Sequence, residues 1–472
     1  AMVYNPTAPV FGEDSPYPFN GEPYGGYFET LGLFDSFNPV SMVNQNTNTG
    51  SRNEFTYSAN FKYQLSDNIK LNAMYSEQSS KYTNKEYYRT TSLYRGNATS
   101  PTRKGEARLT SGENKFRLFE AYGDVNVDAS EKLNMKFTGG YSWQEENFNS
   151  YFLSAGDFPN DNLQYIDALE WSQDKINAGF IDVSSDRSPN QRIIAFFARA
   201  NATFDDAIYF NASVRHEGST KLGENEKWGT FPAFGLGADL NKYLQLENVD
   251  LLKVRVGYGV TGSLPSQYGL AVARFEPTAD LLSTNQTTDA NPDLKWEEKA
   301  ETNFGVEFNM GRLSATLDLY TRKVSDFILE RAVDAAVYPT GRRVENGGDL
   351  STDGFELAFN YDIIKKDDLT YNSGIVLSSY KTTLDTFDTR TLNGNLGAPG
   401  QNDTNVILVA PGEEIGTIIG PVWTGDIVNG AQTFVDVNGD GNTDASQTNQ
   451  IIGNYIDANE DGVRDGDLAV LG

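Results

Sequence analysis

Alternation of apolar and polar residues with a period of two is the feature that most constrains how this chain can fold. The odd-numbered residues of segment 55–65 are apolar, and the even-numbered ones include Lys62 and Gln64. After a turn at 66–68, the alternation resumes over 69–75. Successive side chains of a β-strand point to opposite faces, so each segment is predicted to be a strand with one apolar face. The short turn between the two segments predicts an antiparallel hairpin.

The same alternation recurs in further pairs of segments along the chain. They lie at 119–127 with 133–143, 196–204 with 208–214, 234–240 with 254–260, 302–308 with 313–319, and 355–361 with 369–375. Together they predict about a dozen strands of ~10 to 13 residues, the length at which a tilted strand crosses a bilayer.

Long polar stretches separate these pairs, whereas the turns within most pairs are short. The stretches lie at about 79–114, 145–190, 262–299 and 330–351. Short turns at one end and long loops at the other are typical of outer-membrane barrels. A soluble β-sandwich or propeller also has alternating strands, but it does not require long loops at one end only.

Composition agrees with a barrel whose apolar residues face lipid. Only 38% of residues are hydrophobic, yet 12% are aromatic, as expected for an apolar band with aromatic girdles around a polar lumen. No stretch approaches the ~18 to 20 apolar residues of a membrane-spanning helix. We therefore predict an all-β fold, an antiparallel transmembrane β-barrel. Strands and extracellular loops are expected over 1–382, and an extracellular loop region of the same domain over 383–472.

Charge and residue usage exclude several classes of function. A net charge of −27 disfavours nucleic acid, because its phosphates must be neutralised by Lys and Arg. The absence of Cys removes thiolate chemistry and cysteine metal sites. His216, the only histidine, has no catalytic motif around it and is interpreted as a loop or strand-end residue. No nucleophile elbow, P-loop or zinc-helix motif is present, so an enzyme is not expected.

Two short segments near the end of the sequence have the spacing of calcium loops, with oxygen-bearing residues at positions one, three, five and nine and Gly at position six. The ligands expected, in part through a backbone carbonyl at position seven, are Asp436, Asn438, Asp440, Asn442 and Asp444 in the first loop and Asp457, Asn459, Asp461, Val463 and Asp465 in the second. Position twelve is Gln447 or Leu468 instead of the usual bidentate acid. The alternative is a pair of solvated Asx-Gly turns; structural calcium is the favoured interpretation.

Several motifs resemble one family of transporters. Segment 291–297 reads NPDLKWE and is similar to the NPxLKWE signature of SusC/RagA-like TonB-dependent transporters. Segment 320–326, YTRKVSD, resembles the end of the same hairpin in that family. Supporting segments occur in the family's order at 5–10, 38–40, 215–219, 227–232, 257–262, 346–348 and 354–356. The resemblance covers nearly the whole chain.

This resemblance implies a large barrel, of the 22-stranded plugged class, that actively imports an oligomeric nutrient across the outer membrane of a Gram-negative bacterium. A SusD-like surface lipoprotein would cover its mouth, and TonB–ExbB–ExbD would act on its plug. No plug and no final strands are visible, so a fragment that cannot close a barrel alone is expected. The rivals are a calcium-stabilised surface binding or adhesion protein and a passive porin.

The sequence leaves the substrate open between glycan and peptide. Aromatic residues expected in loops, which could stack on sugar rings, are Tyr151, Phe152, Tyr165 and Trp171. Trp228 and Trp296 are expected in an aromatic girdle at the membrane interface, and Glu297 at a lumen or rim position.

Overall fold

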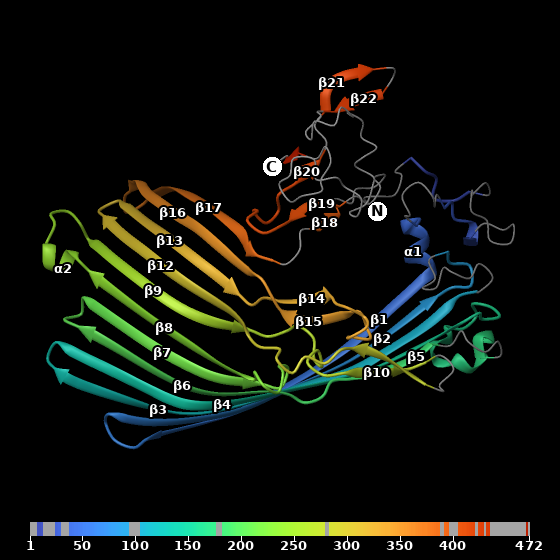
Figure 1. Ribbon diagram of the computed structural model, residues 1–472, viewed down its shortest axis with the longest axis horizontal. Coiled ribbons are helices and arrows are strands. Elements are labelled where there is room, and N and C mark those ends of the chain that lie inside the picture. The colour runs from blue at the N-terminus through green and yellow to red at the C-terminus, as the bar shows by residue number, and fades with distance from the viewer. Residues whose placement is uncertain are drawn as a thin grey trace.

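The computed structural model describes residues 7–12, 24–29, 37–93, 104–175, 182–278, 283–387, 391–395, 405–420, 423–428, 431–434 and 469–470. Its main element is one curved antiparallel sheet that forms a deep trough (Figure 1). The strands along the sheet are β1 (Asn46–Gln64), β2 (Ile69–Tyr88), β3 (Glu106–Ser130), β4 (Leu133–Gly156), β6 (Gln191–Phe204), β7 (Ile208–Ser219), β8 (Trp228–Asp239), β9 (Leu251–Ser263), β12 (Glu297–Met310), β13 (Leu313–Ser325), β16 (Asp349–Lys365) and β17 (Thr370–Thr386). A short strand, β5 (Asp182–Arg187), pairs with the end of β4.

Smaller elements lie beyond the ends of the long strands. They are the hairpins β10 (Arg274–Pro277) with β11 (Thr284–Thr288), β14 (Ile328–Ala332) with β15 (Arg342–Asn346), β18 (Thr391–Asn395) with β19 (Asn405–Val409), β20 (Ile419–Gly420) with β23 (Ala469–Val470) and β21 (Trp423–Val428) with β22 (Ala431–Phe434), and the helices α1 (Pro39–Gln45) and α2 (Asn241–Leu244). Short 3-10 turns are η1 (Tyr24–Gly26), η2 (Tyr165–Asp167), η3 (Leu169–Trp171) and η4 (Gln173–Lys175). Within the described part of the chain, no helix is long and apolar enough to cross a membrane.

Every predicted hairpin is present, in the order predicted. β1 pairs with β2, β3 with β4, β6 with β7, β8 with β9, β12 with β13, and β16 with β17. The tight turn between β6 and β7 has positive φ at Asp205 (50°) and Asp206 (47°), as hairpin turns whose twist matches that of the strands require. The long connections lie at the opposite end of the sheet from α2 (Figure 1).

The alternation separates an apolar face from a polar face across the whole sheet. Phe61 lies opposite Ala73, and Tyr75 lies opposite Phe119, so the apolar positions of neighbouring strands are in register. Large apolar side chains on this face are exposed, among them Phe196 and Phe234. A contiguous exposed apolar face of this extent is stable against lipid and not against water.

Strand length is where the sequence-based prediction was wrong. β2, β3 and β4 contain 20, 25 and 24 residues, well above the length expected. Segments 79–88, 106–114 and 145–156, assigned to loops, are strands. The apolar pattern stops there because these parts extend beyond the apolar band, where neither face must contact lipid, yet backbone pairing continues without interruption.

The sheet is open within the described residues. Among the long strands, β1 pairs there only with β2 and β17 only with β16, so the two end strands do not pair with each other. The end of β17 also forms an isolated bridge between Thr383 and Glu414. Figure 1 shows β1 and β17 at opposite edges of the trough. A direct pairing of β1 with β17 would have indicated a small closed barrel, and the structure does not contain it.

Asn38 connects the segments that precede β1 to one another. Its side chain accepts hydrogen bonds from Val40 N (3.0 Å) and Ser41 N (3.3 Å) and so caps α1. Its amide Nδ2 donates to the carbonyl oxygens of Val10 (2.9 Å) and Phe28 (3.0 Å). The Asn-Pro-Val segment therefore holds the chain at the end of the sheet where the long connections lie, which we call the rim (Figure 1).

Candidate functional site

The polar face of the sheet contains a hollow of about 620 Å³ over β7, β8, β9 and β12. Its wall includes Tyr209 and Asn211 from β7, Lys253 and Arg255 from β9, and Asn303 from β12. All five residues occupy positions that alternate with the apolar ones. The hollow therefore opens on the face that would line a lumen.

Arg255 is held rigidly beside this hollow. Its Nη2 donates to both carboxylate oxygens of Asp318 (2.6 and 2.8 Å), its Nη1 to Asn303 Oδ1 (2.9 Å), and its Nε to Glu307 Oε1 (3.3 Å). A guanidinium group that makes this many charge-assisted bonds is fixed in position. The network links β9, β12 and β13 across the polar face.

At the rim, Phe231 of segment 227–232 packs with Leu294 and Trp296 of segment 291–297 in one small core. Trp296 is only 4% exposed and packs with Leu222, Phe231 and Leu294. Its ring contacts that of Phe231 edge-on, with centroids 5.3 Å apart, and its Nε1 donates to Lys227 O (3.1 Å). The girdle assignment was therefore wrong for Trp296, because its apolar environment comes from other loops and not from lipid.

Gly223 shows how tightly the rim loops pack. Its N–H donates to Leu294 O (2.8 Å), and Asn225 N donates to Pro292 O (3.0 Å). A Cβ at position 223 would lie 2.0 Å from Pro292 O, a backbone atom. Only glycine allows the two loops to approach this closely.

Asn346 joins hairpin β14–β15 to the same rim core. Its Oδ1 accepts from Lys295 N (2.9 Å), and its Nδ2 donates to Lys295 O (3.0 Å) and Asp326 O (2.9 Å). Glu297, the first residue of β12, accepts from Ile328 N (3.2 Å). Segments separate in sequence, 291–297, 326–328 and 342–346, thus form one unit, which we call the rim core together with Leu222, Gly223 and Phe231.

Lys295 adds the main ionic contact of the rim core. Its Nζ lies 2.8 Å from Asp326 Oδ2. The hydrogen bond to Asp326 raises the pKa of Lys295, with Glu226 and Glu298 nearby adding to the effect. The ammonium form is therefore favoured in the folded state.

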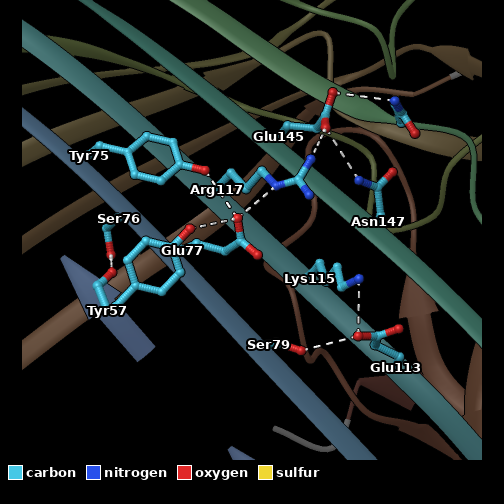
Figure 2. A network of polar contacts seen from close by, with 11 residues as sticks. Tyr57, Tyr75, Ser76, Glu77, Ser79, Glu113, Lys115, Arg117, Glu145 and Asn147 are labelled. Atoms are coloured by element: carbon cyan, nitrogen blue, oxygen red, sulfur yellow. Dashed lines mark hydrogen bonds and ion pairs between the residues drawn. The ribbon is translucent and has the colours of Figure 1, made fainter. Parts of the chain in front are cut away.

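A second polar network lies on the apolar face, at the edge of the apolar band nearest the rim. The sequence did not predict it. Figure 2 shows Arg117 of β3 between Glu77 of β2 and Glu145 of β4. Its Nε lies 3.1 Å from Glu77 and its Nη1 3.3 Å from Glu145, while Arg192 Nε reaches Glu145 at 2.6 Å. Tyr75 also donates to Glu77. We call this alternating row of charges the outer ladder.

The remaining aromatic predictions have mixed outcomes. Trp228 is 47% exposed on the apolar face and stacks on His216 with ring centroids 4.9 Å apart, in agreement with an interfacial position. His216 lies near the end of β7, where its Nδ1 is 2.8 Å from Thr230 Oγ1. Tyr151 and Phe152 are in strand β4 and not in a loop. Tyr165 and Trp171 lie in the 3-10 turns η2 and η3.

The two predicted calcium loops, with Asp436, Asn438, Asp440, Asn442, Asp444, Asp457, Asn459, Asp461, Val463 and Asp465, lie outside the described residues. Among the residues that are described, no group of three or more acidic, His or Cys side chains is arranged to hold a metal ion.

Comparison with known proteins identifies the class defined by this sheet. The family described as TonB dependent receptor-like, beta-barrel, matches residues 4–459. TonB-dependent receptor P3 of Formosa agariphila is 23% identical over 93% of this chain and 44% of its own length. TonB-dependent receptor SusC of Bacteroides thetaiotaomicron is 23% identical over 79% and 38%. The RagAB peptide transporter structure superposes with a TM-score of 0.74 at 19% identity, over 89% of this chain and 45% of that one.

The sheet is therefore that of an outer-membrane β-barrel. The chain belongs to the TonB-dependent receptor β-barrel family, and the resemblance to SusC and RagA that its motifs indicated is confirmed. It spans less than half the length of these relatives.

Proposed function

We propose that this chain forms part of the barrel wall of a TonB-dependent importer that carries an oligomeric nutrient, a glycan or a peptide, across the outer membrane. The observation that carries the proposal is the family match over residues 4–459. A sheet with an apolar outer face and a polar face bearing a hollow of about 620 Å³ supports it. SusC is named as a TonB-dependent receptor and RagAB as a peptide transporter.

The similarity to SusC also supports a second part of the proposal: the full protein acts as the SusC-like component of a SusCD-type complex. A SusD-like lipoprotein would close the extracellular mouth, and TonB–ExbB–ExbD would act on a plug inside the barrel. Further strands would pair the edges of β1 and β17 that no other long strand covers within the described residues, because unpaired strand edges are not stable in lipid.

The test is nutrient uptake by cells that carry the full-length gene and its partner. A deletion strain and a strain lacking TonB are compared with the parent on peptide digests and a panel of polysaccharides as sole nutrient. Loss of growth on the same nutrient in both strains supports active import. Uptake that persists without TonB supports a passive porin, and unchanged growth with lost surface binding supports an adhesion protein.

We also propose that the loops beginning at Asp436 and Asp457 bind structural calcium through the ligand positions given above. The support is the repeated spacing of oxygen-bearing side chains. Calorimetry on the full-length protein should show calcium binding that is weakened by Asp440→Asn and Asp461→Asn. Absence of binding at roughly millimolar calcium, the weak end of extracellular sites, would remove the proposal.

A further inference from the structure

We propose that the hollow on the polar face is a subsite for an extended oligomer that bears carboxylate groups. This inference rests on the proposed function, because it assigns a chemical class to the transported molecule. It starts from the charges of the hollow and from the shape of its floor.

The ionic contacts around the hollow leave two cationic side chains without an anion. Arg255 is paired with both Asp318 and Glu307, and Glu301 with Arg322 at 2.8 Å. Lys253 and Lys299 form no ion pair with any residue that the structure describes.

The two carboxylates that lie opposite Lys253 in the neighbouring strands are already engaged. Asp239, opposite Lys253 in the β8–β9 pair, accepts the N–H of Asn241 (3.1 Å) at the start of α2. Glu307, opposite Lys253 in the β9–β12 pair, accepts from Arg255 Nε (3.3 Å). The Lys253 ammonium lies instead over the ring of Tyr209, 5.7 Å from its centroid. In a protein with a net charge of −27, two unpaired lysines in one hollow are a local exception that favours an anionic ligand.

Four glycines line the floor of the hollow: Gly235, Gly237, Gly257 and Gly259. The protein's own packing explains only Gly235, where an added Cβ would lie 2.7 Å from Asn211 Nδ2. At the other three positions an added Cβ would meet nothing closer than 3.4 Å. None of the three has a positive φ. Glycine inside a strand is less favourable than alanine, so a floor of this kind indicates close approach by something outside the sheet.

The shape of the hollow indicates an extended ligand. Lys299 lies opposite Thr261, eight positions along β9 from Lys253. At about 3.3 Å per residue, the two lysines are separated by roughly 26 Å along the strand direction. The glycines lie between these ends, so an extended chain could lie flat on the floor with a carboxylate near each ammonium. Both acidic peptides and uronate-containing glycans have this chemistry.

The test uses the purified full-length protein with its partner lipoprotein. The probes are fluorescein-labelled oligoglutamate and oligogalacturonate long enough to span the roughly 26 Å between the two lysines, about nine residues for the peptide. They are compared with oligoalanine and a maltooligosaccharide of matched length by fluorescence anisotropy. At least one acidic probe should bind more tightly than its neutral counterpart, and the one that does identifies peptide or glycan as the source of the carboxylates. If neither does, the proposal is overturned.

Two pairs of variants then locate the binding. Lys253→Gln combined with Lys299→Gln should weaken acidic-probe binding at least about tenfold, the loss of one or more charge-assisted hydrogen bonds. Lys62→Gln, on the polar face of β1, is the matched control. Gly257→Val should also weaken binding by filling the floor. Gly139→Val, on the apolar face where an added Cβ meets nothing closer than 3.9 Å, should not. Equal effects in variants and controls overturn the proposal.

One rival occupant is the protein's own plug. If Gly257→Val leaves probe binding unchanged but makes another part of the full-length chain sensitive to protease, the hollow seats that part and the proposal fails. Failure of this kind is separate from failure of the proposed function, because TonB-dependent uptake in cells is measured independently.

Discussion

The sheet supports the rim at its long-loop end in two different ways. Strands β2 to β4 extend beyond the apolar band, and the outer ladder of Glu77, Arg117, Glu145 and Arg192 connects them with β6 on the outer face. Strands β8, β9 and β12 contain only 12, 13 and 14 residues, and a buried loop core closes over their ends. One region is thus stabilised by backbone pairing and charges, the other by apolar burial.

The two segments most similar to the family serve the rim core, whereas the supporting segment 257–262 contributes Gly257, Tyr258, Gly259 and Thr261 to the wall of the hollow. The segments that resemble the family signature, 291–297 and 227–232, lie mainly in the rim core, where they pack against each other. The hollow on the polar face is lined mostly by residues outside those segments. The similarity of these segments to the family therefore reflects a packing constraint. Loops whose backbones are in direct contact tolerate few other residues at the contact.

The largest expected effect is on the rim core. Trp296→Ala removes its central side chain, and we expect a loss of about 3–5 kcal/mol from the stability of that unit. Hydrogen exchange of the full-length protein should show faster exchange in β14–β15 and in segment 291–297. The matched control is Trp228→Ala, a half-exposed ring on the apolar face, for which about 1 kcal/mol or less is expected. Equal effects would show that Trp296 is not the centre of a core.

Both regions are expected to lie next to the same band of apolar, lipid-facing side chains. A charge introduced into that band tests this assignment. Ala59→Arg places a charge on the apolar face of β1, opposite Tyr75, and should cost ~2–4 kcal/mol near the bilayer midplane. Asn60→Arg, on the other face of the same strand, should cost under about 0.5 kcal/mol. Folding yield and urea unfolding in lipid vesicles measure both. Normal folding of the Ala59 variant would reject the assignment of this face to lipid.

The sequence predicted the sheet better than it predicted the rim. Strand pairing followed from alternation, because one face of each strand must be apolar where it meets lipid. The full length of β3 could not be predicted in this way, since Lys115 and Glu113 contact polar neighbours beyond the apolar band. The hydrogen-bonded ladder continues there without any apolar pattern to reveal it.

The candidate sites were harder to predict from the sequence than the sheet was. The burial of Trp296 depends on Leu222 and Phe231, which reach it only through loop packing. The alternating polar positions of β9 did indicate that Arg255 faces away from lipid, but its partner Asp318 becomes identifiable only from the register of three strands. Strand register sets which charges are neutralised, and period-two patterns alone do not specify it.

The outer ladder should show an intermediate effect. Glu145 has a side chain that is only 5% exposed and bridges two arginines. Glu145→Gln leaves both arginines with a neutral partner, and after allowance for their solvent exposure we expect a loss of about 1–2 kcal/mol. The exposed pair Lys85–Asp167 is the control, and Lys85→Gln should cost under about 0.5 kcal/mol. Urea unfolding followed by circular dichroism measures both. A Glu145 effect as small as the Lys85 effect would contradict a supporting role for the ladder.

The smallest effect should come from the ionic contact of the rim core, because Lys295 is 44% exposed there. Lys295→Met should cost under about 1 kcal/mol at pH 8. Since the contact with Asp326 raises the pKa of Lys295, its contribution is fully present below the unfolded pKa of about 10.4 and is lost as the pH rises through the higher folded value. The stability difference between the parent and Lys295→Met should therefore shrink above that range, in urea unfolding of the full-length protein measured from pH 8 upward. A difference that stays constant after the lysine has deprotonated would show that the charge does not cause it, because methionine retains most of the apolar contact and leaves the charge as the main change.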